Sequence, residues 1–358
     1  MNILHLMQDC VELRDTLNIR KVKREIDKVL NEPSLYPDMP RKSFKQRKKE
    51  NWQWYLKNKE PCLFYNSYGF DIEGFRNQDD YLPYRQFRIE RNREDLTSLH
   101  QAKYENKLCL LRDKVAFAAY FGTLLGEKYV VKSLGKVLAD GRVYDLTANE
   151  FISLSRLLEI GDRLFVKKMN GECGEGCYLI DSSSDLKALA ESMKGSEYLV
   201  QYVVPQHEAI NAVNDSCLNT IRIITVYSNG VPCVFAHFMR FGGGDLINDN
   251  RATGGYAVGI SDDGKLMKHG IGHHSMSEIH PKSKVVFEGI EIPYWEDVKK
   301  LVVKAHMLLP EIPTIGWDVA ITPDGPILIE GNDNWEITGS QDTFGGLKKK
   351  WYDLRNKK

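Results

Sequence analysis

The sequence lacks the features that mark several broad classes of protein. Its 49 basic and 49 acidic residues cancel, so no global field attracts it to nucleic acid or to an anionic membrane. The longest apolar run, Val115 to Phe121, is far too short to span a bilayer, and the N-terminus has no basic segment followed by a long apolar one. We therefore expect a soluble cytoplasmic protein without a nucleic-acid partner.

Cysteine and histidine are present without a clear disulfide or metal pattern. The scattered cysteines predict reduced thiols rather than a disulfide framework. They are Cys10, Cys62, Cys109, Cys173, Cys177, Cys217 and Cys233. Four histidines crowd the segment "KHGIGHHSMSEIH", namely His269, His273, His274 and His280. A metal site and an exposed polar loop are both open interpretations of this cluster, and the glycines between the histidines favour the loop.

The composition is that of an ordinary globular protein. With 358 residues, 42% of them hydrophobic, the chain is long enough for two or three packed domains. Apolar spacing predicts one amphipathic helix or two short ones from residue 1 to about 30. The segment 41–59 combines eight basic residues with the aromatic residues Trp52, Trp54 and Tyr55. It is either a polyanion-binding patch or, as we favour, a solvated helix whose aromatic side chains face the core. From 65 to 93 we expect a long ordered loop.

The rest of the chain predicts helices and strands in runs. We predict helices over 111–126, 147–161, 182–195 and 294–309, the second opened by Thr147 in capping-box spacing. We predict strands over 129–135, 162–169 and 196–204, and a β-hairpin over 219–243. The pattern indicates an α+β fold with antiparallel sheets. We divide the chain into a helical or irregular region 1–110, a first subdomain 111–200 and a second subdomain 201–358.

The stretch "LFVKKMNGECGEGCYLI" predicts a strand, a glycine-rich loop and a second strand. Lys167 lies on the incoming strand, and Gly174 and Gly176 lie in the loop. Glycines let backbone amides approach phosphate oxygens, and a lysine on the strand supplies a point charge. The lysine precedes the glycines, which distinguishes this loop from the Walker loop. The hairpin is therefore a candidate phosphate site, with a plain turn as the alternative.

Two apolar runs near the C-terminus, in "GWDVAITPDGPILIEGNDN", each carry a carboxylate. If Ile321 pairs with Ile327 across a five-residue turn, Asp318 lies directly opposite Glu330, and Asn332 projects from the same face. Two opposed carboxylates destabilise a sheet unless a cation lies between them. Oxygen ligands of this kind suit Mg²⁺. The pattern predicts a magnesium site, with acids that point to water as the alternative.

Taken together, these parts resemble the ATP-grasp superfamily, in which two α+β subdomains hold ATP between antiparallel sheets. The resemblance implies that Lys114, in the Asp-Lys pair that opens a helix, contacts the nucleotide. It implies that Lys167 and the glycine loop cover the phosphates, and that the strand around Tyr198 to Val204 offers its backbone to adenine. The implied adenine and ribose contacts are Gln201, Tyr202, Val203 and His207.

Three longer stretches are similar to the branch called sugar-transfer-associated ATP-grasp. They are "QHEAINAVNDSCLNTIRIITV", "AHFMRFGGGDLINDNRATGGYAVGI" and "GWDVAITPDGPILIEGN". The resemblance implies that Arg222 and Arg240 face the transferred phosphate, where a guanidinium fork suits phosphate geometry. Asn219, in the Asn-Thr-Ile-Arg motif, is a third catalytic candidate. By the same resemblance, Asp318, Glu330 and Asn332 are the magnesium ligands.

The activity implied is that of an ATP- and Mg²⁺-dependent carboxylate–amine ligase, which forms an amide through an acyl phosphate. The branch name implies substrates from surface-polysaccharide assembly, such as an amino acid and a sugar acid. Two alternatives stay open. One is a kinase that phosphorylates a hydroxyl, and the other is a non-catalytic nucleotide- or polyanion-binding protein that uses the basic segment 41–59.

Overall fold

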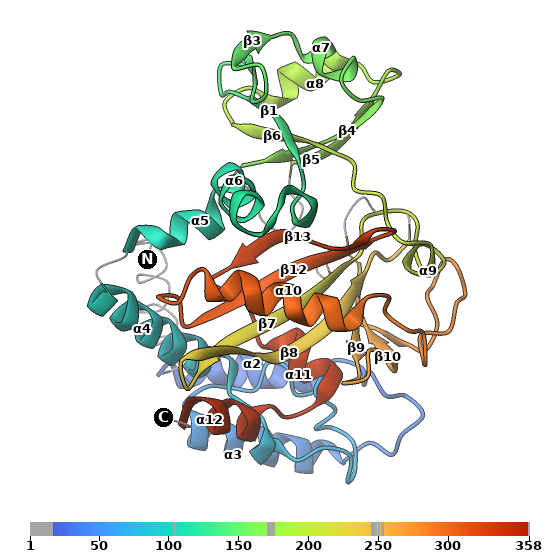
Figure 1. The fold of residues 1–358 in the computed structure, drawn as a ribbon. Helices are drawn as coiled ribbons and strands as arrows, with labels where there is room; N and C mark the ends of the chain where they lie inside the picture. Colours follow the sequence, from blue (N-terminus) through green and yellow to red (C-terminus); the bar gives the residue numbers. More distant parts are fainter. Residues whose placement is uncertain are drawn as a thin grey trace.

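The computed structural model describes residues 17–102, 105–169, 176–244, 249, 251 and 254–356, and its strands form a smaller sheet above a larger one (Figure 1). The α-helices are α2 (Ile19–Asn31), α3 (Phe44–Asn58), α4 (Tyr84–Ala102), α5 (Cys109–Arg112), α6 (Lys114–Leu125), α7 (Leu154–Leu158), α8 (Leu186–Met193), α9 (Glu208–Asn211), α10 (Trp295–Met307), α11 (Thr338–Phe344) and α12 (Lys348–Asn356). Short 3₁₀ helices are η1 (Gln78–Asp80), η2 (Glu105–Leu108) and η3 (Glu127–Tyr129). No described helix combines the length and apolarity that a membrane crossing needs.

The smaller sheet has the strand order β3-β2-β1-β6-β4-β5, with every neighbouring pair antiparallel. Its strands are β1 (Ser133–Val137), β2 (Val143–Asp145), β3 (Glu150–Ile152), β4 (Arg163–Lys168), β5 (Cys177–Asp181) and β6 (Tyr198–Tyr202). Alternate residues of β4, such as Leu164 and Val166, are fully buried in a core that Leu157 of α7 and Met193 of α8 complete. The predicted strands 162–169 and 196–204 are thus confirmed.

The larger sheet has the order β11-β10-β9-β8-β7-β12-β13 and is also antiparallel throughout. Its strands are β7 (Thr220–Ser228), β8 (Val231–Phe241), β9 (Tyr256–Ile260), β10 (Leu266–Ile271), β11 (Met276–Ser277), β12 (Thr314–Thr322) and β13 (Gly325–Asn332). The predicted hairpin of β7 and β8 is confirmed. Its turn needs two left-handed residues, and Asn229 (φ 53°) and Gly230 (φ 80°) supply them. The antiparallel α+β expectation is therefore correct for both sheets.

The two faces of the larger sheet differ. Helix α10 covers one face through an apolar stripe that includes Val298 and Val302, as its sequence pattern predicts. Helices α11 and α12 lie near the opposite face (Figure 1). Helices α2, α3 and α4 lie on the same side, and we call residues 17–102, which contain these three helices, the N-terminal layer. Gln341 joins α11 to the N-terminal layer, because its side chain accepts from Leu82 N at 2.8 Å and donates to Leu82 O at 3.1 Å.

Several predictions in the N-terminal half need correction. Residues 84–102 form helix α4 instead of continuing an irregular loop. Thr147 does not open a helix, because Asp145 Oδ1 accepts from Thr147 N in a tight turn, and α7 begins later with Ser153 as its cap. Helix α3 confirms the favoured interpretation of segment 41–59, since Trp54 is buried in the core. The predicted boundaries at residues 110 and 200 stay predictions.

The cysteine prediction is confirmed for the described part of the chain, where Cys62, Cys109, Cys177, Cys217 and Cys233 are free thiols. Cys10 and Cys173 lie outside the described residues. The prediction of an exposed histidine loop is wrong for His280, which is fully buried and forms a hydrogen bond between its Nε2 and Gly242 O at 2.7 Å. Among the described residues no group of three His, Cys, Asp or Glu side chains is placed to hold a metal ion.

Candidate functional site

A row of charged side chains crosses three neighbouring strands of the larger sheet and ends on the edge strand β13. Strand β12 lies between β7 and β13, and Asp318 on β12 is directly opposite Arg222 on one side and Glu330 on the other. Residues directly opposite each other in an antiparallel pair project from the same face. We call Arg222, Asp318 and Glu330 the charged row. It brings together three residues that the sequence placed in two separate motifs.

Asp318 is held by two arginines. Arg222 donates from Nε to Asp318 Oδ1 at 2.5 Å and from Nη2 to Oδ2 at 3.1 Å. Arg240, on β8, lies 2.7 Å from Oδ2 through its Nη2. Burial alone would raise the pKa of Asp318, which is 2% exposed, but the charges of Arg222 and Arg240 outweigh it and hold that pKa well below its usual range. Asp318 is therefore ionised and fixes the orientation of both guanidinium groups.

Glu330 has the opposite electrostatic setting. Burial, reinforced by the negative charge of Asp318, raises the pKa of Glu330. Its Oε1 accepts a hydrogen bond from Asn332 Nδ2 at 3.3 Å. No Lys, Arg or His of the described residues forms an ion pair with Glu330. Glu330 thus presents a carboxylate whose negative charge is only partly compensated, beside the neutral amide of Asn332.

The pairing of Asp318 with Glu330 is as predicted, although the predicted turn is wrong. Ile321 pairs with Pro326, one position earlier than expected, because the hairpin turns through only two residues. A β-bulge then shifts the register between Asp318 and Val319, so that Ile329 has no partner of its own. The bulge compensates for the one-residue shift at the turn, so that Asp318 still pairs with Glu330.

The two predicted nucleotide lysines lie near this row. Lys167, on β4 of the smaller sheet, is 8% exposed, and burial lowers its pKa to about 8. The charge of Glu330 acts against that shift and the charge of Lys114 adds to it, so both groups lie within electrostatic reach of Lys167. Lys114, at the start of α6, donates from Nζ to Met169 O at 2.7 Å. Two cations therefore face the acidic end of the charged row from the smaller sheet and α6.

The start of α6 is well defined. Asp113 is its N-cap, with its Oδ1 accepting from Val115 N and Ala116 N at 2.9 Å each. The two residues of the Asp-Lys pair thus have different positions: Asp113 caps the helix, and Lys114 lies in its first turn. The charge of Lys114 acts on the pKa of Lys167.

The glycine hairpin is confirmed as a strand–loop–strand unit. Lys167 pairs with Cys177 across β4 and β5, and Gly176 closes the hairpin in a left-handed conformation (φ 67°) that glycine adopts without strain. Gly174 lies outside the described residues, as do residues 170–173 and 175. Its contact with phosphate stays a prediction.

The residues predicted to contact adenine and ribose lie where the smaller sheet leads into the larger one. Gln201 is buried on β6 and donates from Nε2 to Ser133 Oγ at 3.2 Å. Tyr202 ends that strand and Val203 follows it, both partly buried. His207 caps α9 through its Nδ1, and its backbone N donates to Ile321 O at 2.8 Å. Nucleotide contacts for these residues stay predictions.

Asn219 has a different local setting from the two arginines. Its Nδ2 donates to Gln206 Oε1 at 3.0 Å and to Asn214 O at 2.7 Å, and its Oδ1 accepts from Gly242 N at 3.0 Å. The side chain is 1% exposed and its hydrogen-bonding groups are already used. Asn219 therefore fixes the loop before β7, and direct contact with a substrate would require one of these bonds to break.

Sequence reasoning missed a third carboxylate in this region, beside Arg240. Asp249 accepts from Thr220 Oγ1 at 2.6 Å and from Thr220 N at 2.9 Å, and it lies 3.5 Å from Arg240 Nε. Burial raises its pKa, although the charge of Arg240 opposes this. The segment "GGGDLINDNRATGG" contains two candidate acids, Asp245 and Asp249. No local pattern shows which of the two acids lies beside Arg240. Thr220 pairs with Arg240 across β7 and β8, and Asp249, which binds Thr220, therefore lies beside this arginine.

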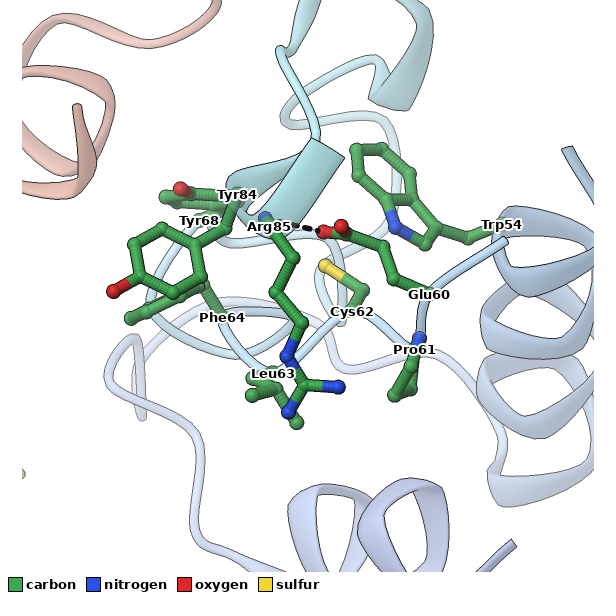
Figure 2. Close-up of a pocket in the computed structure, with 9 residues that line it drawn as sticks. All are labelled: Trp54, Glu60, Pro61, Cys62, Leu63, Phe64, Tyr68, Tyr84 and Arg85. Carbon is green, nitrogen blue, oxygen red and sulfur yellow. Dashed lines mark hydrogen bonds between the residues drawn. The ribbon is translucent and has the colours of Figure 1, made fainter. Parts of the chain in front are cut away.

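A small cavity lies inside the N-terminal layer, and no residue of the charged row lines it (Figure 2). Its wall includes Trp54, Glu60, Cys62 and Arg85, and its volume of about 10 Å³ fits about one water molecule. Burial raises the pKa of Glu60 to about 7, although the backbone N–H groups of Gln86 and Arg85 donate to its carboxylate. The cavity is too small for a nucleotide.

Comparison with known proteins agrees with this arrangement. Residues 156–349, more than half of the chain, match the family described as sugar-transfer associated ATP-grasp. That span contains both sides of the glycine hairpin and the whole charged row. A search of curated proteins found no match.

Solved structures of ligases show distant likenesses. The N5-carboxyaminoimidazole synthase of Aspergillus clavatus has 11% identity and a TM-score of 0.36, and the alignment covers 62% of this chain but only 44% of that one. The D-alanine–D-alanine ligase of Bacillus anthracis has 11% identity and a TM-score of 0.38, with coverage of 69% and 67%. The ATP-grasp ligase PsnB has 14% identity and a TM-score of 0.42, with coverage of 76% and 74%. None of these likenesses identifies a substrate.

Proposed function

The chain belongs to the sugar-transfer associated ATP-grasp family, and from that premise we propose that it is an ATP-dependent ligase that joins a carboxylate to an amine. The charged row carries this proposal. Its Asp318 orients the guanidinium groups of Arg222 and Arg240, and its Glu330 is a partly compensated carboxylate within electrostatic reach of Lys167, on which the charge of Lys114 also acts. Phosphoryl transfer needs such a set, because its catalysis is mostly positioning and charge stabilisation.

The donor groups fit a magnesium ion at one end of the row. Glu330 and Asn332 supply oxygens of the hard type that Mg²⁺ prefers. Burial and the charge of Asp318 raise the pKa of Glu330, and a bound cation would stabilise its ionised form. Asp318 is the third proposed ligand, although both its oxygens already accept from arginine. When bound, the ion neutralises the negative charge of the ATP phosphates.

The lysines and arginines of the site have separate proposed roles. Lys114 and Lys167 approach from the side of the smaller sheet and hold the β- and γ-phosphates. Arg222 and Arg240, already fixed by Asp318, stabilise the charge that develops on the transferred group without having to reorganise.

The proposed reaction has two steps. In the first, an oxygen of the substrate carboxylate attacks the γ-phosphorus of ATP, the bond to the β-phosphate oxygen breaks, and ADP leaves. In the second, the amine attacks the acyl carbon, inorganic phosphate leaves with the electrons of the C–O bond, and the nitrogen loses a proton to give the amide. We propose an amino acid and a sugar acid of surface-polysaccharide synthesis as the substrates, on the family description alone.

The test is a screen for ADP release with pairs of amino acids and uronic acids. A ligase releases ADP and phosphate in equal amounts, and hydroxylamine in place of the amine traps the acyl phosphate as a hydroxamate. Glu330→Gln should abolish both signals in a folded protein, whereas Lys57→Ala, which changes an exposed residue of α3 far from the row, should leave them unchanged. A stable phosphate ester with no hydroxamate would instead indicate a kinase.

A further inference from the structure

An ion pair joins the residue after strand β13 to α5, the short helix directly before the helix α6 that begins with Lys114. Arg112, the last residue of α5, donates from Nε to Asp333 Oδ1 at 3.0 Å and from Nη2 to Asp333 Oδ2 at 2.5 Å. This is the bidentate geometry in which a guanidinium fixes the orientation of a carboxylate. Asp333 directly follows Asn332, and Arg112 stands two positions before Lys114. The pair therefore connects the two proposed binding elements directly.

Packing beneath the ion pair is equally close. A Cβ at Gly331 would lie 2.7 Å from Leu111 Cδ2, so glycine lets α5 lie directly on β13. Leu111 is buried in the main core of the larger sheet. Between this contact and the Asp113 cap of α6, Arg112 has little freedom to move its backbone. The ion pair thus acts from a rigid support.

A second arginine holds the next residues of the same segment. Arg91 of α4 donates from Nη1 to Trp335 O and from Nη2 to Asn334 Oδ1, the latter at 3.1 Å. Its guanidinium lies 4.5 Å from the centre of the Trp335 ring. Three consecutive residues after Asn332 are therefore bound by arginines from two different helices.

We propose that Arg112 is a positioning residue, which fixes the end of β13 so that Glu330 and Asn332 keep a set distance from Lys114. The inference rests on the proposed function, because it assigns these three residues to metal and nucleotide binding. Arg112 reaches the segment from the Lys114 side, and Arg91 closes it from the N-terminal layer.

A role in surface stability explains these observations less well. The side chains of Arg112 and Asp333 are 43% and 20% exposed, and ion pairs with such exposure add little to global stability. Their effect should instead be local, as for the outer residues of metal sites, whose loss typically weakens metal affinity or activity about 10- to 100-fold. Stability and metal-dependent binding are therefore expected to respond differently to the same substitution.

The experiment measures ADP binding to the full chain by calorimetry, with and without Mg²⁺. Arg112→Ala and Asp333→Asn should each weaken binding about tenfold with Mg²⁺ and leave binding without Mg²⁺ unchanged. Hydrogen exchange should quicken at the amides of residues 331–335 and nowhere else. The double variant Arg112→Glu with Asp333→Lys, which reverses the pair, should recover most of the affinity. Arg156→Ala breaks an exposed ion pair on α7 and is the matched control, with no expected effect.

The outcomes separate this inference from the proposed function. If the wild-type chain binds ADP in a Mg²⁺-dependent way and both single variants bind equally well, Arg112 is not a positioning residue, while the proposed function stands. If the wild-type chain shows no Mg²⁺-dependent binding, the proposed function and this inference fail together. Weaker binding in the reversed pair than in either single variant would also count against positioning.

Discussion

Replacing Asp318 with asparagine should weaken the fold, whereas replacing Glu330 with glutamine should not. Both residues are acids on neighbouring strands, and both are proposed ligands of the same ion. They differ in their partners, because Asp318 neutralises Arg222 and Arg240 while Glu330 has no cationic partner among the described residues. The same chemical change therefore breaks two ion pairs at one position and removes an uncompensated charge at the other.

The magnitude follows from burial. Removing one partner of a buried ion pair costs about 3–5 kcal/mol, because a charge is left without compensation. The side chains of Arg222 and Arg240 are 15% and 18% exposed, so water reaches them in part. We expect a loss near the lower bound, about 3 kcal/mol, for Asp318→Asn. For Glu330→Gln we expect an unfolding free energy equal to that of the wild type or higher, because a partly buried charge beside Asp318 is removed.

The assay is unfolding in guanidinium chloride at pH 7 in the presence of EDTA, followed by tryptophan fluorescence. Trp317 is fully buried next to Asp318 and reports on the larger sheet. Equal slopes of free energy against denaturant would show that both variants unfold from a native state of the same compactness. A loss below about 1 kcal/mol for Asp318→Asn, or a larger loss for Glu330→Gln, would refute the reasoning.

Three further predictions concern a buried histidine, a nucleotide lysine and a close-packed glycine. Burial lowers the pKa of His306 to about 4, so the unfolding free energy should fall by up to about 3 kcal/mol as the pH drops from 6.5 to 4, and urea unfolding of His306→Gln should lack that fall. Burial lowers the pKa of Lys167 to about 8, so ADP affinity measured by calorimetry should fall as the pH rises through 8, and Lys167→Met should bind weakly at every pH. Gly331→Ala should lose about 1–3 kcal/mol, measured by thermal unfolding, because its Cβ would meet Leu111 Cδ2 at 2.7 Å; an unchanged melting temperature would contradict it.

The site was partly predictable because strand alternation is local. Asp318, Glu330 and Asn332 lie on one short hairpin, so their common face follows from the period of two along a strand. The two arginines that hold Asp318 were not predictable as its partners. Arg222 is 96 positions from Asp318, and no local pattern states which strand lies beside β12. The bulge at Ile329 was equally hidden, since hydrophobic alternation tolerates it.

The fold shows the same division between local and distant causes. Helix α4 escaped prediction because the glycines before it suggested a loop, although Pro83 directly before Tyr84 is a helix-start signal. Its first turn is completed from far away, by Glu60, whose carboxylate accepts from Arg85 N and Gln86 N at 3.1 and 2.8 Å. The helices α3, α6 and α10 were predictable from their own residues, since each carries its own apolar face or cap.

The contacts of the N-terminal layer affect how the protein folds during its synthesis. Leu82 bonds to Gln341, a residue that the ribosome adds 259 positions later. At translation rates of about 5–20 residues per second this delay lasts about 13–52 s. Strands β7 to β10 are made within that interval, but the contact between the N-terminal layer and α11 cannot form until Gln341 has been added. The N-terminal layer is thus made before the elements that complete its packing, and its surface stays incompletely covered until the C-terminal helices have been added.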